Sequence, residues 1–381
     1  MSAYLKTYDL TLSCLGPVFI GSGEKRTPKE YVQGTQLIYF PDMQRLYADI
    51  AAQGKAKSFE AFMMSTSTGG GSGAGSRLDE WLKRNGIKPS LAKHGGYWVT
   101  TGPLVAGRPR RSRGGQIARQ QHQLNEIHAF IKDAYGNPYV PGSSIKGMLR
   151  SIYLQSQMHR MSPPLRVGAS NKLEQNRFGE NNEYRLVRKA GRPGTREFDA
   201  VNDLFQAIRV GDSPPLTTSD LLICQKVDMN VRGETGGLPL FRECLKVGTR
   251  FTVRVTLDTS PPQRGGWPDG ERFLDTLEDE ADYVNNARYA RYAAQFWDDD
   301  PRQGPIVYLG GGAGYRSKTF VTDQEDMAKV LDRQFPKIKH STKTRDLGVS
   351  PLVLKITKSG DQHHEMGMCE LSIKRVEEGR A

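Results

Sequence analysis

The segment Phe251–Leu257 constrains the fold more than any other part of the chain, because its apolar and polar residues alternate strictly. Alternation with a period of two residues is typical of a β-strand with one buried face. A shorter alternation over Leu10–Cys14 predicts a second strand near the N-terminus. Helical periodicity is found in three further segments, Ser144–Gln157, Phe198–Ile208 and Glu271–Trp297. Strands interrupted by helices predict an α+β fold built from packed layers.

A breaker-rich stretch at Pro261–Gly270 follows the predicted strand and indicates a domain boundary. The chain has 381 residues, a length that favours two domains of about 100–200 residues each. We therefore expect an N-terminal domain over residues 1–262 and a C-terminal domain over residues 263–381. The Gly/Ser segment Ser65–Ser76 has the composition of a flexible coil, and we interpret it as an exposed insertion within the first domain.

The positive charge of the chain is concentrated in one segment. The formal net charge is +12, and residues 101–196 hold 17 Lys and Arg against 5 Asp and Glu, an excess equal to that whole net charge. Within this segment, Arg108, Arg110, Arg111 and Arg113 stand among glycine and proline in a predicted basic loop. A basic surface of this kind indicates a polyanionic partner, and nucleic acid is the most common one.

Several classes of protein are excluded by what the sequence lacks. No stretch approaches the roughly 18–20 apolar residues that a membrane span needs, so we expect no membrane partner. The four cysteines are scattered without a CxxC pair, which indicates neither a disulfide framework nor a thiolate zinc site. We expect reduced thiols in a cytoplasmic protein, with no cofactor and no metal.

The segment Val140–Arg150 is the most informative local motif. Its Pro-Gly pair predicts a turn, and either Ser143 or Ser144 can cap the helix that follows. Lys146 and Arg150 are four residues apart and share one face of that helix. Amide groups at the helix start, a hydroxyl and two cations together favour a phosphate site. The alternative is an ordinary capped helix with two solvated cations.

Two glycine-rich segments resemble this motif in being followed by cations. Gly21, Ser22 and Gly23 precede Lys25 and Arg26. The second segment follows a predicted strand at 306–309 and contains Gly310, Gly311, Gly312, Gly314, Tyr315, Arg316 and Lys318. Glycine allows a close backbone approach to a ligand, although neither segment matches a nucleotide-binding fingerprint. Taken alone, each segment predicts a tight turn.

Together the three segments resemble the RAMP superfamily of CRISPR RNA-binding proteins. The resemblance is carried by Pro17–Gly23, by Val140–Arg150, which matches the signature PGSSxKGxxR, and by Gly310–Lys318. Their order and spacing are similar to those of the subunit that caps the 3′ end of the guide RNA (crRNA) in the type III-A Csm effector complex. The resemblance covers roughly residues 4–320.

The resemblance implies a fold, a function and a set of partners. It implies two ferredoxin-like (RRM-type) RAMP domains with long basic insertions. It also implies a non-catalytic crRNA-binding subunit that supports crRNA maturation and antiviral interference. Its partners would be crRNA, a neighbouring RAMP backbone subunit, the small subunit and, through the complex, target RNA. The glycine segments, both serines and the cations named above would hold RNA phosphates, and Tyr315 would stack on a base or pack in the core.

Catalytic residues are poorly indicated. The family often has a histidine where this chain has Phe19, and the carboxylate nearest the first glycine segment, Glu24, stands beside two cations with which we expect it to pair. His159 lies near the basic segment without a surrounding pattern that specifies catalysis. A guide-precursor-processing endoribonuclease that uses His159 or Glu24 is the alternative from the enzyme class. A general nucleic-acid-binding scaffold is a third possibility.

Overall fold

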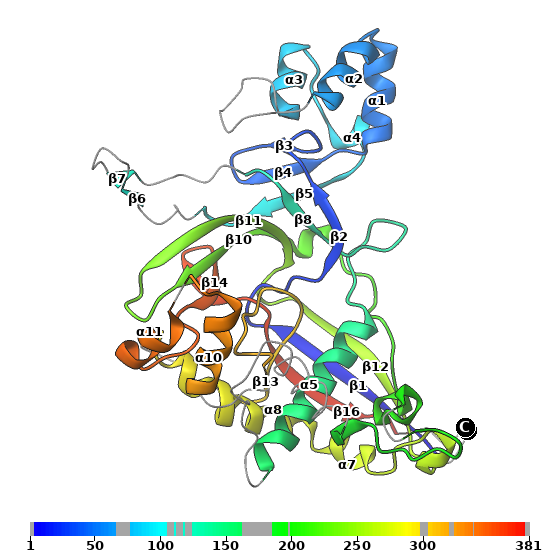
Figure 1. The fold of residues 1–381 in the computed structure, drawn as a ribbon. Helices are drawn as coiled ribbons and strands as arrows, with labels where there is room; N and C mark the ends of the chain where they lie inside the picture. The colour runs from blue at the N-terminus through cyan, green and yellow to red at the C-terminus, as the bar shows by residue number, and fades with distance from the viewer. Residues whose placement is uncertain are drawn as a thin grey trace.

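The computed structural model describes residues 4–65, 77–104, 110–111, 117–118, 124–161, 185–196, 199–297, 304–319, 324–337 and 339–377. The Gly/Ser segment beyond Ser65 lies outside the described residues, as do Arg108, Arg113 and all of residues 162–184. Arg110 and Arg111 form the short strand β6 (Arg110–Arg111), which pairs with β7 (Ile117–Ala118). The described part is a mixed α+β fold with two sheets (Figure 1).

A five-stranded sheet forms the lower part of the molecule in Figure 1. Its strands in spatial order are β13 (Ile306–Tyr308), β16 (Met368–Arg375), β1 (Leu5–Cys14), β12 (Arg250–Asp258) and β9 (Ile208–Val210). All neighbouring pairs are antiparallel. In chain order, β1, helix α5 (Gly142–Arg160), β9, β12, helix α8 (Leu277–Val284) and β16 make a β-α-β-β-α-β unit.

The two alternating segments of the sequence form the centre of this sheet. Leu10 lies opposite Val253, and Leu12 lies opposite Phe251, so the apolar positions of β1 and β12 share one face. All four side chains are buried, and α5 and α8 cover the face that they form. The sequence prediction of both strands and of a helix over 144–157 is therefore confirmed.

The second sheet has nine strands and lies above the first in Figure 1. Its main path runs β2 (Gly21–Arg26), β8 (Ile127–Phe130), β11 (Thr235–Leu245), β10 (Leu221–Met229), β5 (Tyr97–Thr101), β4 (Leu37–Phe40) and β3 (Val32–Gln33). The hairpin of β14 (Leu354–Ser359) and β15 (Gln362–Glu365) joins it by pairing with the end of β10.

A small helical cluster packs beyond the β3 edge, at the top of Figure 1. It contains α1 (Met43–Ala52), α2 (Ala56–Met64), α3 (Leu78–Arg84) and α4 (Leu91–His94). Phe59, Phe62 and Trp81 pack together at its centre, separately from the main core. The side chain of Asp42 caps α1 by accepting from the backbone N–H groups of Gln44 and Arg45.

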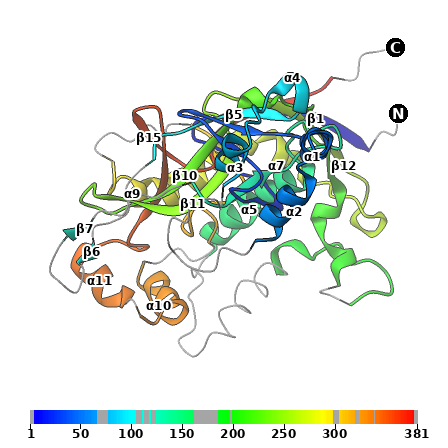
Figure 2. The ribbon, with the colours of Figure 1, turned by 90° about the horizontal axis from the view of Figure 1, so that it is seen from above.

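The C-terminal third differs from the single long helix predicted over Glu271–Trp297. The structure divides that segment into α7 (Gly270–Asp275), α8, a π-helical stretch (Asn285–Ala290) and α9 (Arg291–Ala293). Two further helices, α10 (Gln324–Gln334) and α11 (His340–Leu347), pack against each other. Seen from above, they lie on one flank of the molecule, away from β1 and β12 (Figure 2).

The prediction of a helix over Phe198–Ile208 was wrong. Two short 3-10 turns, Ala200–Asn202 and Leu204–Ala207, stand there instead and lead directly into β9. Further 3-10 turns occur at Thr218–Asp220 and Pro262–Arg264. The helix-like spacing of apolar residues in this segment therefore reflects 3-10 turns that bury Leu204 and Phe205 in the main core.

Each sheet takes strands from both sides of residue 262, so the expected boundary does not separate one sheet from the other. The division into domains 1–262 and 263–381 stays a prediction. All four cysteines are buried and unpaired, as the sequence predicted. Within the described ranges, no helix is both long and apolar enough to cross a membrane.

Candidate nucleic-acid interface

The start of α5 places the central motif, but it is not capped as the sequence predicted. Pro141 is the N-cap, and neither Ser143 nor Ser144 caps the helix with its side chain. Instead, the N–H of Gly142 donates to Asp212 Oδ1 at 2.7 Å. A Cβ at Gly142 would lie 2.2 Å from the carbonyl oxygen of Val210, so glycine is required by the close approach of α5 to the end of β9.

The two cations of the motif have different surroundings. The guanidinium of Arg150 pairs with the carboxylate of Asp203 at 2.8 Å and lies over the ring of Phe205, with 5.4 Å from its central carbon to the ring centre. Lys146, one turn earlier, is half-buried and makes no ion pair with any described residue. Burial lowers the pKa of Lys146, Asp203 opposes that shift, and Arg150 adds to it. Of the two cations, Lys146 is therefore the one without an acidic partner among the described residues.

Gly310–Lys318 is the third of the three motif segments, and it forms a compact turn that contacts the residues before Gly21. We call it the third glycine segment, or the third glycine turn. The N–H of Gly311 donates to the carbonyl oxygen of Phe19 at 2.7 Å. Gly310 has φ +76°, and a Cβ there would lie 2.1 Å from that same carbonyl oxygen. The ammonium of Lys318 donates back to the carbonyl oxygen of Gly310 and closes the turn. The fold thus brings the first and third glycine segments together.

A pocket of about 300 Å³ joins the central motif to the third glycine segment. One wall is the first turns of α5, and the opposite wall is β13 with the glycine turn that follows it. Its polar lining comes from both motifs and includes Ser143, Ser144, Gly147, Gly310, Arg316 and Lys318. Two segments more than 150 residues apart in sequence, at 143 and 310, therefore line one cavity with residues that carry hydroxyl groups, glycine backbone and cations.

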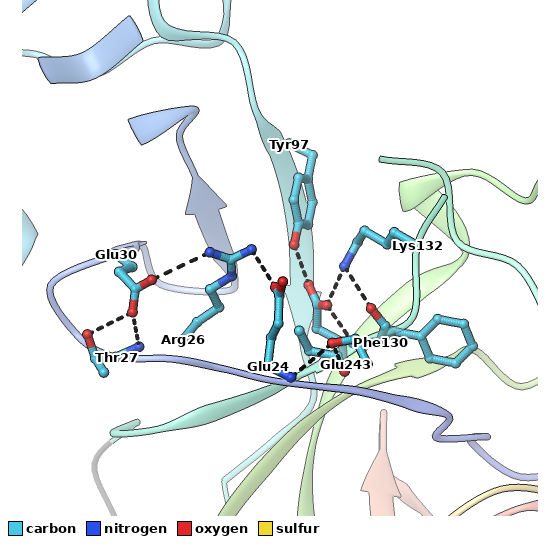
Figure 3. A network of polar contacts seen from close by, with 10 residues as sticks. Glu24, Arg26, Thr27, Glu30, Tyr97, Phe130, Lys132 and Glu243 are labelled. Carbon is cyan, nitrogen blue, oxygen red and sulfur yellow. Dashed lines mark hydrogen bonds and ion pairs between the residues drawn. The ribbon is translucent and has the colours of Figure 1, made fainter. Parts of the chain in front are cut away.

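The first glycine segment is a strand and not the predicted turn. Gly21 and Lys25 pair with β8, opposite Phe130 and His128. The ammonium of Lys25 lies 2.9 Å from Glu126. Figure 3 shows the guanidinium of Arg26 between two acids, 2.9 Å from Glu24 and 3.5 Å from Glu30. Glu24 thus pairs with a neighbouring cation as expected, and both cations of this segment are partly neutralised.

Sequence reasoning missed a buried carboxylate beside this strand. Glu243 on β11 is fully buried and accepts hydrogen bonds from Tyr97 Oη at 2.8 Å and from the N–H of Phe130 at 2.9 Å (Figure 3). It also pairs with Lys132 Nζ at 2.5 Å, and that ammonium lies 4.8 Å from the centre of the Tyr97 ring. Burial and Glu243 both raise the pKa of Tyr97.

The position of Glu243 in the sequence contained a usable signal. It stands between Phe241 and Leu245 on the inward face of β11, where period-two alternation calls for an apolar residue. An acid at such a position requires buried partners. Those partners come from β5 and β8, which are remote in sequence, so they could not be named in advance.

The catalytic candidates lie apart in the fold. Glu24 is on β2, whereas His159 is at the far end of α5, where its ring contacts Tyr283 edge-on at 5.5 Å between ring centres. Among the residues that the structure describes, no cluster of three or more His, Cys, Asp or Glu side chains is arranged to hold a metal ion.

Comparison with known proteins agrees with the motif resemblance. The family model of the RAMP superfamily matches residues 11–316. A curated Mycobacterium tuberculosis protein, Csm5 of a CRISPR system, is 61% identical over 99% of this chain and 100% of its own length. The chain belongs to the Csm5 family of the RAMP superfamily. A Csm5 protein of Streptococcus thermophilus is 31% identical over 98% of both chains.

Solved structures share the fold of this Csm5 family member. A chain of a Csm–crRNA–target RNA ternary complex of a type III-A CRISPR system superposes with a TM-score of 0.61 and 19% identity, covering 96% of this chain and all of that one. The crystal structure of T. onnurineus Csm5 gives a TM-score of 0.57 at 18% identity, covering 94% and 99%. At these identities the likeness concerns the fold alone.

Proposed function

We propose that this protein is a non-catalytic crRNA-binding subunit of a type III-A Csm effector complex, where it caps the 3′ end of the crRNA. The proposal is supported by its membership of the Csm5 family and by the Csm–crRNA–target RNA complex that holds a chain of the same fold. In this role it supports crRNA maturation and RNA-guided interference in the cytoplasm. Its neighbours are a RAMP backbone subunit and the small subunit, and it meets target RNA through the complex.

The observation that carries the proposal is the cavity shared by the α5 motif and the third glycine turn. Its lining includes two serines with hydroxyl groups, glycine backbone and the cations Arg316 and Lys318. Backbone and hydroxyl groups of this kind contact RNA phosphate and sugar without reading the base sequence. Lys146, which has no acidic partner among the described residues, adds a cation on the same helix. A subunit that must accept guides of many sequences needs such contacts.

The same proposal assigns roles to the rest of the fold. The β-α-β-β-α-β unit corresponds to one ferredoxin-like RAMP domain, and the nine-stranded sheet belongs to its divergent counterpart. The basic insertions that hold Arg108, Arg110, Arg111 and Arg113 extend the phosphate contacts. Further backbone and cation contacts to the RNA come from β2, through Gly21, Ser22, Gly23, Lys25 and Arg26.

Binding without cleavage is the first expected result. Purified protein is incubated with labelled crRNA repeat sequence, with and without divalent metal, and both mobility and length of the RNA are followed. We expect a retarded complex and full-length RNA in every lane, because neither Glu24 nor His159 lies in a catalytic cluster. Specific cleavage that disappears in Glu24→Ala or His159→Ala would establish the endoribonuclease alternative instead. Equal competition by DNA of the same length would favour a general scaffold.

Lys146→Ala is expected to weaken RNA binding in a salt-dependent way. Removing one phosphate contact on a single strand lowers the slope of log K against log salt by about 0.7. The control is Lys57→Ala, which removes an exposed lysine from α2. Arg150 is left unchanged because its loss would also break the pair with Asp203. Equal slopes for Lys146→Ala and the wild type would contradict the phosphate role of Lys146.

A further inference from the structure

A second and larger cavity lies on the other side of the third glycine turn. It has a volume of about 700 Å³ and is lined by residues of α10, α11, the ends of β10 and β14, and residues 313–316 of the turn. This volume falls within the ordinary range for small-ligand sites. The helices that form its outer wall are the pair on the flank of the molecule in Figure 2. Arg316 and Tyr289 line both cavities, so the glycine turn is the partition between them.

Aromatic side chains give this cavity flat apolar surfaces. Tyr315 comes from the glycine turn, Tyr292 from α9, and Phe335 from the residue after α10. Phe335 lines the cavity and is 49% exposed. Phenylalanine side chains are more often buried, so this exposure is uncommon. Aromatic rings facing an open cavity provide stacking surfaces for planar ligands.

The charge of the lining is strongly positive. Lys226, Arg316, Lys343 and Lys355 line the cavity against a single carboxylate, Asp228. Asp228 pairs with Lys355 at 2.6 Å. Lys226 is half-buried and makes no ion pair with a described residue, and burial together with Lys355 lowers its pKa. An anionic ligand would be attracted by this excess of cations over carboxylates in the lining.

A buried histidine supplies unpaired polar atoms. His340 at the start of α11 is 8% exposed and lines the cavity, yet neither of its ring nitrogens has a hydrogen-bond partner among the described residues. Buried polar atoms are almost always paired, so this side chain calls for a ligand. Burial lowers the pKa of His340, so the neutral ring offers one donor and one acceptor.

We infer that this cavity binds one nucleotide of a single-stranded RNA, with the base among Tyr315, Phe335 and His340 and the phosphate toward Lys226 and Arg316. A nucleotide is the ligand class that needs stacking surfaces, hydrogen-bonding atoms for the base edge and cations together. The inference rests on the proposed function and adds to it. Because the glycine turn separates the two cavities, a strand held by its phosphates at α5 passes over the turn and places a following nucleotide here.

The test uses the full-length protein and a series of short single-stranded RNAs, each carrying 2-aminopurine at one position. Stacking on an aromatic side chain quenches this base. We expect quenching at one position in the bound RNA. The double variant Tyr315→Leu/Phe335→Leu, which keeps apolar volume but removes both rings, should abolish it and weaken binding about 10-fold. The control is Tyr135→Leu, which removes a ring that is 91% exposed in a distant turn.

The outcomes separate this inference from the proposed function. Wild-type protein that binds RNA with no position quenched, or a double variant that quenches like the wild type, overturns the nucleotide pocket and leaves RNA binding intact. Protein that binds no RNA overturns the proposed function as well. AMP is added as a competitor, and displacement of the quenched base by AMP at an affinity equal to that of RNA would assign the cavity to a free nucleotide. Circular dichroism melting of each variant verifies that it is folded.

Discussion

Replacing Glu243 with alanine is expected to lower the free energy of unfolding by about 3–5 kcal/mol. The carboxylate is fully buried and is shared by three donors from β5, β8 and the residue Lys132. Its removal leaves an ammonium with little exposure and no counter-charge, and it leaves the Tyr97 hydroxyl unpaired. Uncompensated buried charge is among the few single changes with effects of this size. Urea unfolding followed by circular dichroism measures the change.

A matched control and a rescue variant sharpen this prediction. Glu271 also pairs with a cation, Arg375 at 2.8 Å, but both side chains are partly exposed, so Glu271→Ala should cost less than about 1 kcal/mol. The double variant Glu243→Leu/Lys132→Met removes both buried charges and should recover part of the loss. If Glu243→Ala and Glu271→Ala destabilise equally, the buried network does not hold β5, β8 and β11 together.

Gly310→Ala is expected to destabilise the protein by about 2–4 kcal/mol and to weaken RNA binding. An alanine at φ +76° pays about 1–2 kcal/mol for its left-handed backbone. Its Cβ would also lie 2.1 Å from the carbonyl oxygen of Phe19, so the glycine turn must move away from the segment between β1 and β2. The movement would open the cavity shared with α5. Urea unfolding and RNA titration measure the two effects.

Gly248→Ala separates the two causes of destabilisation, which are the left-handed backbone and the steric clash. Gly248 has φ +85° and no heavy atom within 4 Å of the position of an added Cβ. Its substitution therefore carries the backbone cost without the clash, and RNA affinity should be unchanged. Equal stability losses at both positions would show that the approach of Gly310 to Phe19 is not tight. A Gly310→Ala variant with wild-type RNA affinity would show that the glycine turn does not contribute to RNA binding.

Those parts of the fold that depend on local pattern were predictable from the sequence. The strand β12 follows from alternation, and α5 follows from apolar spacing after a Pro-Gly turn. Errors arose where the partner lies far away in the chain. Asp212, which binds the first amide of α5, is 70 residues from it, and no local feature marks it as the cap. The glycine strand β2 exists because β8 pairs with it more than 100 residues later.

In the candidate site, too, the sequence could not show which partners come from distant parts of the chain. Lys146 and Arg150 are equivalent in the sequence, since both are cations on one helix face. Asp203 makes them different by pairing with Arg150, and it lies 53 residues away. Likewise, composition placed Tyr315 beside a glycine turn, but only the packing of α10 and α11 against that turn shows that a cavity faces it. Motifs identified the segments, and the tertiary structure decided which atoms are exposed to a ligand.

The place of β16 in the five-stranded sheet has a consequence for synthesis of the chain. It lies between β13 and β1, although its residues, 368–375, follow those of every other strand in the described residues. While the ribosome is still making the preceding 367 residues, β1 has an unpaired edge and β13 has no neighbour in this sheet. Such edges are prone to pair with other chains, and distant pairings form slowly. The nascent protein therefore depends on its last described strand to cover these edges and protect it from aggregation.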